Sequence, residues 1–143
     1  SNNEKTIELL LQHQANVNEK NNAGKTPLHF VCQKQNNEKT MEILFKYQAN
    51  VNEKDDHGKT AMHLACSLSN NEKTIELLLQ HQANVNEKNN AGKTPLHFVC
   101  QKQNNEKTME ILFKYQANVN EKDDHGKTAM HLACSLSNNE KTI

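Results

Sequence analysis

Several features that mark particular classes of protein are scarce or missing in this sequence. There is no arginine and no tryptophan, and 17 lysines balance 4 aspartates and 13 glutamates, so the formal net charge is zero. Binding to a polyanion usually requires a basic excess that neutralises phosphates, so this balance argues against a nucleic-acid partner. The longest apolar runs, such as residues 77–79, are far shorter than the roughly 20 residues that span a bilayer, which argues against a membrane protein.

Signals of secretion are also missing. Residues 1–5 are polar and lack the apolar stretch of a signal peptide, and no Asn-x-Ser/Thr glycosylation site occurs anywhere. We therefore expect an intracellular protein of the cytoplasm or nucleus.

Only four cysteines are present, spaced 34 residues apart, at Cys32, Cys66, Cys100 and Cys134. Two disulfides are one interpretation of an even count. We favour four small buried thiols, because each cysteine follows apolar residues at the same place in its repeat and buried cysteine packs as a small hydrophobic residue.

The chain is built by repetition. Residues 1–68 are identical to residues 69–136, and residues 137–143 begin a third copy. A weaker 34-residue period lies inside this unit, because residues 2–6 recur at 36–40. The unit is therefore a pair of related modules, A and B, and the chain reads A-B-A-B.

Each module predicts two short helices. Thr26 and Pro27 begin the first helix, since threonine is a good N-cap and proline suits the first helical position. Leu28, Val31 and Cys32 follow at i, i+3 and i+4, which places them on one helix face. An apolar fraction of only 34% is typical of disordered chains, but the helical spacing of the apolar residues predicts a folded chain.

The second helix begins near Asn37, with Glu38 in its first turn, where a negative charge suits the helix dipole. Its apolar stripe is Met41, Leu44 and Phe45, matched in the other module by Ile7, Leu10 and Leu11. Residues 15–24 are polar and end in glycine, so they predict a loop or short hairpin. Neither helix can bury its stripe within one module, and we therefore expect modules to stack into an all-α solenoid.

Residues 24–29, Gly-Lys-Thr-Pro-Leu-His, closely resemble the G-x-T-P-L-H signature of ankyrin repeats, and residues 58–63 are a weaker variant of it. Residues 10–11 and 15–18 resemble the end of the same repeat. The resemblance covers the whole chain and implies an ankyrin-repeat solenoid of helix-turn-helix modules with hairpin-like loops and uncapped ends. In the family's frame the complete repeats are 21–54, 55–88 and 89–122, with partial repeats at 1–20 and 123–143.

The sequence departs from the family at two glycine positions. After the second helix the family has glycine where this chain has Gln14, Gln48, Gln82 and Gln116. If the backbone there is left-handed, each glutamine costs about 1–2 kcal/mol. After the first helix the glycine is replaced by an Asn36-Asn37 pair, and asparagine tolerates that conformation better than most residues. A consensus design would keep these glycines, so we interpret the chain as natural modules that were duplicated or joined.

Two short motifs suggest chemistry. Residues 24–26, Gly-Lys-Thr, match the end of a phosphate-binding loop, but Glu19 stands where the pattern needs glycine, and Pro27 follows at once. His29 and Cys32 lie one helical turn apart, as two zinc ligands can, but a structural site normally needs four. The resemblance implies instead that the histidine hydrogen-bonds neighbouring loops. Because every candidate recurs in each module, whereas an active site normally occurs once, we expect no enzyme activity, no cofactor and no metal.

The resemblance implies that a protein partner contacts the hairpin tips and the exposed side of the first helices. By motif position these residues are Asn22, Ala23, Lys25, Gln33 and Lys34 in module A, and Asp56, His57, Lys59, Ser67 and Leu68 in module B. The second unit repeats them at Asn90, Ala91, Lys93, Gln101, Lys102, Asp124, His125, Lys127, Ser135 and Leu136. Near the ends of the second helices the set includes His13, Tyr47, His81 and Tyr115. The tyrosines are the strongest candidates, because exposed aromatic residues are favoured anchors.

These observations predict a protein-interaction module whose partner is not named by the sequence. The alternative is a structural or model repeat array, natural or engineered, with no dedicated partner, and ligand binding by the His/Cys columns is a third interpretation. Neither end departs from the internal sequence, whereas terminal repeats of stable solenoids carry polar caps. We therefore expect head-to-tail stacking on other copies, with residues 137–143 moving aside for residues 1–14.

Overall fold

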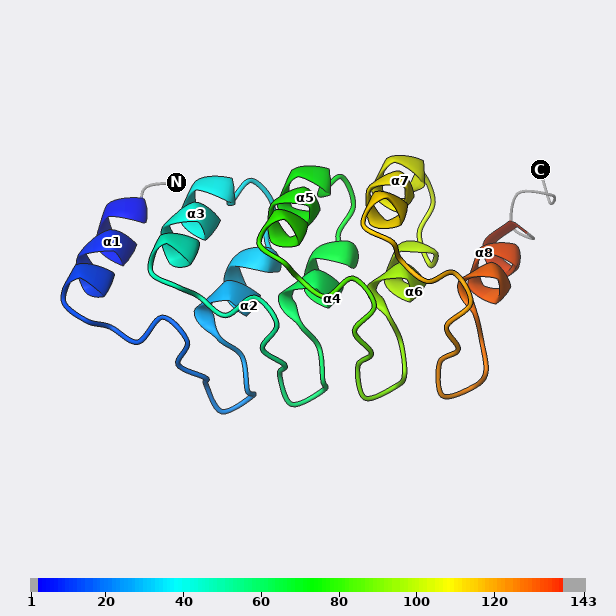
Figure 1. Ribbon diagram of the computed structural model, residues 1–143, viewed down its shortest axis with the longest axis horizontal. Coiled ribbons are helices and arrows are strands. Elements are labelled where there is room, and N and C mark those ends of the chain that lie inside the picture. Colours follow the sequence, from blue (N-terminus) through cyan, green and yellow to red (C-terminus); the bar gives the residue numbers. More distant parts are fainter. Residues whose placement is uncertain (1–2, 138–143) are drawn as a thin grey trace.

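The fold is an elongated stack of helix pairs (Figure 1). The computed structural model describes residues 3–137, and this range contains eight α-helices and no strand. The helices are α1 (Glu4–Gln12), α2 (Pro27–Cys32), α3 (Glu38–Lys46), α4 (Ala61–Cys66), α5 (Glu72–Gln80), α6 (Pro95–Val99), α7 (Glu106–Lys114) and α8 (Ala129–Ser137). Helices α1, α3, α5 and α7 form one layer, α2, α4, α6 and α8 form the second, and the loops project beyond the second layer (Figure 1). The predicted all-α solenoid is therefore confirmed.

The helices are short. The longest of those described have nine residues, and none has the length and apolar character needed to cross a bilayer. Isolated helices of this length are marginal in water, so each one depends on packing against its neighbours.

The first helix of each module begins, as predicted, at a threonine. Thr26 has an extended backbone (φ −88°, ψ 169°), and Pro27 occupies the first helical position of α2. His29 takes the place that glutamate holds in an ordinary capping box, because the backbone N–H of Thr26 donates to His29 Nδ1 at 3.0 Å. The helix start is thus fixed by groups from within the module.

Both kinds of helix are followed by a left-handed residue that is not glycine. The residues after the second helices, Gln14, Gln48, Gln82 and Gln116, have φ values between 69° and 72°. The residues between the two helices of a module, Asn36, Asn70 and Asn104, have φ values between 55° and 61°. The backbone is therefore left-handed at both departures from the family pattern. The next asparagine ties the two helices together, since Asn37 Nδ2 donates to the Val31 carbonyl at 3.1 Å.

The core runs along the stack between the two layers. Its most completely buried apolar side chains are Leu28, Met41, Met62, Ile75, Leu78, Leu96 and Leu112. Helix α4 shows how this burial arises, because it packs against α2, α5 and α6 at once. A first helix is therefore fully buried only when modules lie on both sides of it.

The ends of the stack differ from the predicted pattern of burial. Leu10, expected on the buried stripe of α1, is 57% exposed, whereas its copy Leu78 is fully buried. Cys134, expected as a buried thiol, is exposed, whereas the other three cysteines are buried. Both predictions are wrong for the same reason, since the described residues contain no further module outside α1 or α8. The displacement expected for residues 137–143 concerns a segment that lies almost wholly outside the described residues.

Candidate functional site

The loops between modules are closed by a side-chain oxygen at their base. In module B, Asp55 Oδ1 accepts the backbone N–H groups of His57 and Lys59, both at 2.9 Å. In module A, Asn21 Oδ1 accepts the two equivalent N–H groups at the same distance. An amide oxygen therefore replaces the carboxylate without change of geometry, and the loops of both modules have the same shape.

Neighbouring loops are also bonded to one another. The N–H of Asp56 donates to the Ala23 carbonyl at 3.0 Å, and the N–H of Asn90 donates to the His57 carbonyl at 3.0 Å. The loops approach so closely that glycine is required, because a Cβ atom on Gly58 would lie 2.5 Å from Asn90 Oδ1 and 2.8 Å from the Asn90 nitrogen. The loop tips therefore form one continuous ridge along the stack.

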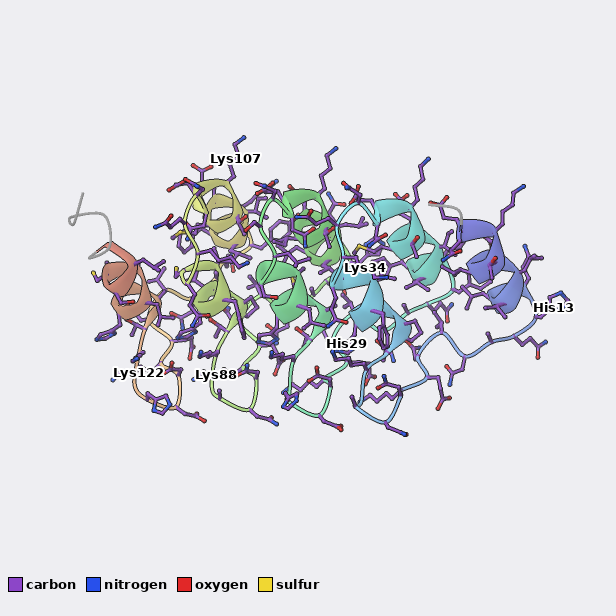
Figure 2. The ribbon with its side chains drawn as sticks, turned by 180° about the vertical axis from the view of Figure 1, so that it is seen from behind. His13, His29, Lys34, Lys88, Lys107 and Lys122 are labelled. Atoms are coloured by element: carbon purple, nitrogen blue, oxygen red, sulfur yellow. The ribbon has the colours of Figure 1, made fainter. Side chains whose placement is uncertain are left out.

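The histidines of α2, α4 and α6 each link their own module to the next loop. Figure 2 labels the first of them, His29, near α2. His29 Nε2 lies 2.9 Å from the Lys59 carbonyl oxygen, and His63 Nε2 lies 3.0 Å from that of Lys93. Since Nδ1 accepts a backbone N–H, the ring is neutral and Nε2 donates its proton to the carbonyl. Burial lowers the pKa of His63, which favours this neutral form.

The motifs that suggested metal or phosphate binding are used by the fold itself. Both ring nitrogens of His29 are engaged, and burial raises the pKa of the Cys32 thiol to about 12, which disfavours the thiolate that binds zinc. In the part of the chain that the structure describes, no three His, Cys, Asp or Glu residues are grouped closely enough to hold a metal ion. The N–H groups of residues 23–26, which a phosphate loop would offer to its ligand, are donated to Asn21 and His29.

The residues predicted to contact a partner lie mainly on the second layer and its loops. The tip residues Asn22, Ala23, Asp56, His57, Asn90, Ala91, Asp124 and His125 are all exposed. Beside the tips, Lys25, Lys59 and Lys93 are half-buried and Lys127 is exposed. At the far ends of the first helices, Gln33, Lys34, Ser67, Gln101 and Ser135 are exposed, and Leu68, Lys102 and Leu136 are half-buried. The structure therefore gathers these three groups on one side of the stack.

The tyrosines do not belong to that group, because Tyr47 and Tyr115 follow the second helices in the other layer. The prediction that they are exposed anchors is wrong in its premise, since both are half-buried and pack against the core. The Tyr47 hydroxyl donates to Glu8 Oε2 at 2.9 Å, and Lys46 Nζ lies 3.1 Å from the same oxygen. These two contacts, the tyrosine hydrogen bond first, lower the pKa of Glu8.

The two histidines in the predicted set also follow second helices. His81 stacks on the Phe45 ring, with centroids 4.0 Å apart and the planes at 7°, so it joins two modules. His13 holds the same place after α1 and is exposed.

An aromatic residue that the sequence-based prediction missed lies on the second layer. Phe98 in α6 is half-buried, with Lys59 Nζ 5.6 Å and Lys93 Nζ 5.9 Å from its ring centroid. The ring also meets His63 edge to face at 5.6 Å. The sequence does carry a signal for this residue. Phe98 follows Leu96 by two residues, so it lies off the i, i+3, i+4 stripe that faces the core. Each lysine thus makes a cation–π contact with the Phe98 ring.

Other lysines lie along both long edges of the molecule. Figure 2 shows Lys107 on the edge of the molecule opposite the loops, and Lys88 and Lys122 on the loop side. Lys88 is held across a module boundary, because its Nζ lies 3.0 Å from Glu121 Oε1 and donates to the Lys122 carbonyl at 3.2 Å. Lysines at the loop bases, such as Lys88, therefore join modules. Lysines on the opposite edge, such as Lys107, are exposed, and changing them can serve as a control for changes on the loop side.

Comparison with known protein families gives a match over the whole length. The family model for ankyrin repeats (three copies) matches residues 1–89 and 69–143, and these two segments together cover the chain. No curated protein sequence matches. The matched range includes both 68-residue units and every helix described above.

Proposed function

This chain belongs to the ankyrin-repeat family, and we propose that it is a non-enzymatic module that binds another protein through one side of its stack. We call this side the loop face. It consists of the exposed loop tips at residues 22–23, 56–57, 90–91 and 124–125, of half-buried Phe98, and of the exposed residues just after the first helices, such as Gln33, Ser67 and Gln101. Ankyrin repeats are generally protein-interaction modules, which supports this assignment. The proposed complete repeats remain 21–54, 55–88 and 89–122.

The observation that carries the proposal is the cluster of Phe98, Lys59 and Lys93. A half-buried aromatic ring offers apolar area to a partner at a small cost in entropy, and the flanking ammonium groups add charge. Such a cluster suits a partner segment that carries an acidic side chain beside an apolar one. Tyr47 and His81 lie after second helices in the other layer, where they make contacts between modules.

The repeated sequence also favours a particular manner of binding. Stacked helices lie about 8–10 Å apart, so the A-B pattern recurs about every 20 Å along the loop face. A partner with several binding segments can therefore engage more than one unit, and the effective concentration of the second segment strengthens the complex.

We expect the protein to act in the cytoplasm or nucleus. The three buried cysteines are free thiols, each alone in its module, and such thiols persist in a reducing compartment.

The loop face can be tested by affinity capture from an extract of the source cells. Combining Lys59→Glu and Lys93→Glu with Phe98→Ala should reduce the amount of each specifically captured protein at least tenfold. The matched control reverses two exposed charges in the other layer, with Lys73→Glu and Lys107→Glu, and should leave capture unchanged. If both variants capture what the parent chain captures, the loop face is not the binding surface. If the parent chain captures nothing specific, the alternative of a structural array without a dedicated partner is favoured.

A further inference from the structure

A row of lysines runs along the stack beside the loop tips. Each of its members directly precedes the threonine that begins a first helix, so every loop contributes one, and we call Lys25, Lys59, Lys93 and Lys127 the lysine row. The loops lie side by side along the stack (Figure 1), and the backbone N–H of each lysine is held in the same way at its loop base. Stacked helices lie about 8–10 Å apart, so the lysines recur at about this interval.

The central pair of the row fits this spacing. Lys59 Nζ lies 5.6 Å and Lys93 Nζ 5.9 Å from the centroid of the Phe98 ring, so the two ammonium groups are no further apart than these two distances together. All three residues belong to interior modules, which have α2 on one side and α8 on the other. One aromatic ring thus lies beside two successive lysines in the middle of the stack.

The lysine row is not neutralised by the chain itself. At the loop bases, Lys54 Nζ lies 2.7 Å from Glu87 Oε2 and Lys88 Nζ lies 3.0 Å from Glu121 Oε1. Among the described residues, no lysine of the row forms such an ion pair. A chain with zero net charge therefore carries a line of uncompensated positive charge beside its loop tips.

The helices beside the row offer little apolar area. Leu64, which takes the place of Phe98 in α4, is only 7% exposed, and Met62 is 1% exposed. An amphipathic partner helix would need a groove that accepts apolar anchors at i, i+3, i+4 and i+7. Helices α4 and α6 offer only Phe98 to such anchors, because their other side chains are buried. The surface therefore suits a segment that binds mainly through charge and keeps its backbone in water.

One backbone conformation has the period of the lysine row. A polyproline II helix has three residues per turn and a rise of about 3.1 Å per residue, so every third side chain points the same way at intervals of about 9 Å. This interval lies within the module spacing of about 8–10 Å. In a β-strand, residues three apart point to opposite faces, so a strand does not match. The backbone of polyproline II also has no internal hydrogen bonds and is fully solvated, as this surface requires.

We propose that the loop face binds an acidic segment in the polyproline II conformation, with a carboxylate at every third residue, that lies along the stack. Its carboxylates pair with Lys59, Lys93 and the lysines that continue the row. A second edge of the three-sided helix lays proline on the Phe98 ring, since aromatic rings are the usual contact for proline-rich segments. This inference rests on the proposed function, because it names the partner of the same face.

A protein segment matches the row better than a nucleic acid does. Binding of a single strand relies on a basic excess and on successive aromatic rings that stack on its bases. Here Asp56 and Asp124 are exposed at the loop tips, where they repel a continuous line of phosphates. Helices α4 and α6 supply a single ring, Phe98, to this side. Isolated carboxylates, one for each module, avoid the repulsion and use every lysine.

Fluorescence anisotropy of labelled synthetic peptides on the full chain tests the proposal. The probe is a peptide of four Glu-Pro-Pro triplets, and its control has the same composition with all its glutamates in one block. The triplet peptide should bind at least about fivefold more tightly, because it alone presents one carboxylate to each lysine. An alanine-rich helical peptide with glutamate at every seventh residue and an oligothymidine of similar length should also bind more weakly. A triplet peptide that does not bind, or that binds no better than any of these three, would overturn the proposal.

Matched variants locate the site. Lys59→Gln combined with Lys93→Gln should weaken binding of the triplet peptide at least about tenfold. Lys73→Gln combined with Lys107→Gln removes the same charge from the other layer and should leave binding unchanged. If the two pairs of substitutions have equal effects, the peptide does not bind along the lysine row and the proposal is wrong.

The aromatic contact has its own variant. Phe98→Leu gives α6 the residue that α4 has at this position, so circular dichroism should show the parent's helix content. It should weaken the triplet peptide about threefold, through loss of the ring, and should leave the weak binding of the block peptide as it is. An equal loss for both peptides would contradict a proline contact with Phe98.

The peptide measurements and the capture experiment fail separately. If the loop-face variant loses its captured proteins but the parent chain does not prefer the triplet peptide, the proposed function stands and its acidic polyproline II partner is wrong. If capture does not depend on the loop face, the proposed function is wrong whatever the peptides do.

Discussion

The same six residues, Ala-Met-His-Leu-Ala-Cys, form α4 in the middle of the stack and begin α8 at its end. Met62 of α4 is 1% exposed, whereas Met130 of α8 is 70% exposed. The difference comes entirely from the neighbours, because α4 has modules on both sides and α8 is covered on one side only within the described residues. In this chain, the burial of a first helix depends on the second helix of its own module and on the modules at either side.

The backbone of the two regions shows the opposite behaviour. Gly58 and Gly126 have the same φ of 74°, and the threonine N–H donates to histidine Nδ1 at 3.0 Å in both loops. Turn and cap therefore form without a following loop, while complete side-chain burial needs a following module. Substitutions at matched positions of the two units separate these two contributions.

The largest difference in the free energy of unfolding is expected between lysine substitutions of Met62 and of Met130. Met62→Lys should lower the free energy of unfolding by about 4 kcal/mol, because it buries a charge without a partner. Met130→Lys should change it by less than about 0.5 kcal/mol, because that side chain is in water. Urea unfolding followed by circular dichroism, at dilute protein where copies stay apart, measures both. Equal losses at the two sites would contradict the difference in burial.

A smaller difference is expected for alanine at the two glycines. Both variants place a Cβ atom on a left-handed backbone, which costs about 1–2 kcal/mol. Only Gly58→Ala also meets the next loop, since the Cβ atom of Gly126→Ala has nothing within 4 Å. That overlap should add about 1–3 kcal/mol at Gly58. The difference between the two urea midpoints then measures how tightly adjacent loops are packed, and identical midpoints would mean that the loops move apart freely.

The smallest change in stability is expected for glycine in place of glutamine, and it should be the same in both 68-residue units. Gln48 and Gln116 are exact counterparts, and each has a φ of 69°. Changing either one to glycine should stabilise the chain by about 1 kcal/mol, because the strain is relieved but the unfolded chain gains freedom. Thermal or urea unfolding of the two single variants gives the comparison. A gain at one site only would show that this backbone strain depends on the neighbouring module.

Much of the fold follows from local patterns in the sequence. The helix start at Thr26 and Pro27 depends on residues within one module, and the structure has it as predicted. The left-handed turns at glutamine and asparagine likewise depend on nearby residues. Stacking follows from the same patterns, because neither helix can bury its stripe alone.

Features that depend on distant residues could not be predicted in this way. Tyr47 is half-buried because its hydroxyl meets Glu8, 39 positions earlier. Phe98 lies between two lysines of different loops, and only the stacking of those loops brings them to one ring. The helical spacing of Leu10 predicts a core residue. Leu10 is exposed because no helix among the described residues covers it.

The hydrogen bonds between loop tips have a consequence for amide exchange. The N–H groups of Asp56, Asn90 and Asp124 belong to exposed residues, yet each is donated to a carbonyl of the preceding loop. Such a hydrogen can exchange with solvent only when its two loops separate. The exchange rates of these three amides therefore report the opening free energy of three successive module boundaries, each in the native chain and without any substitution.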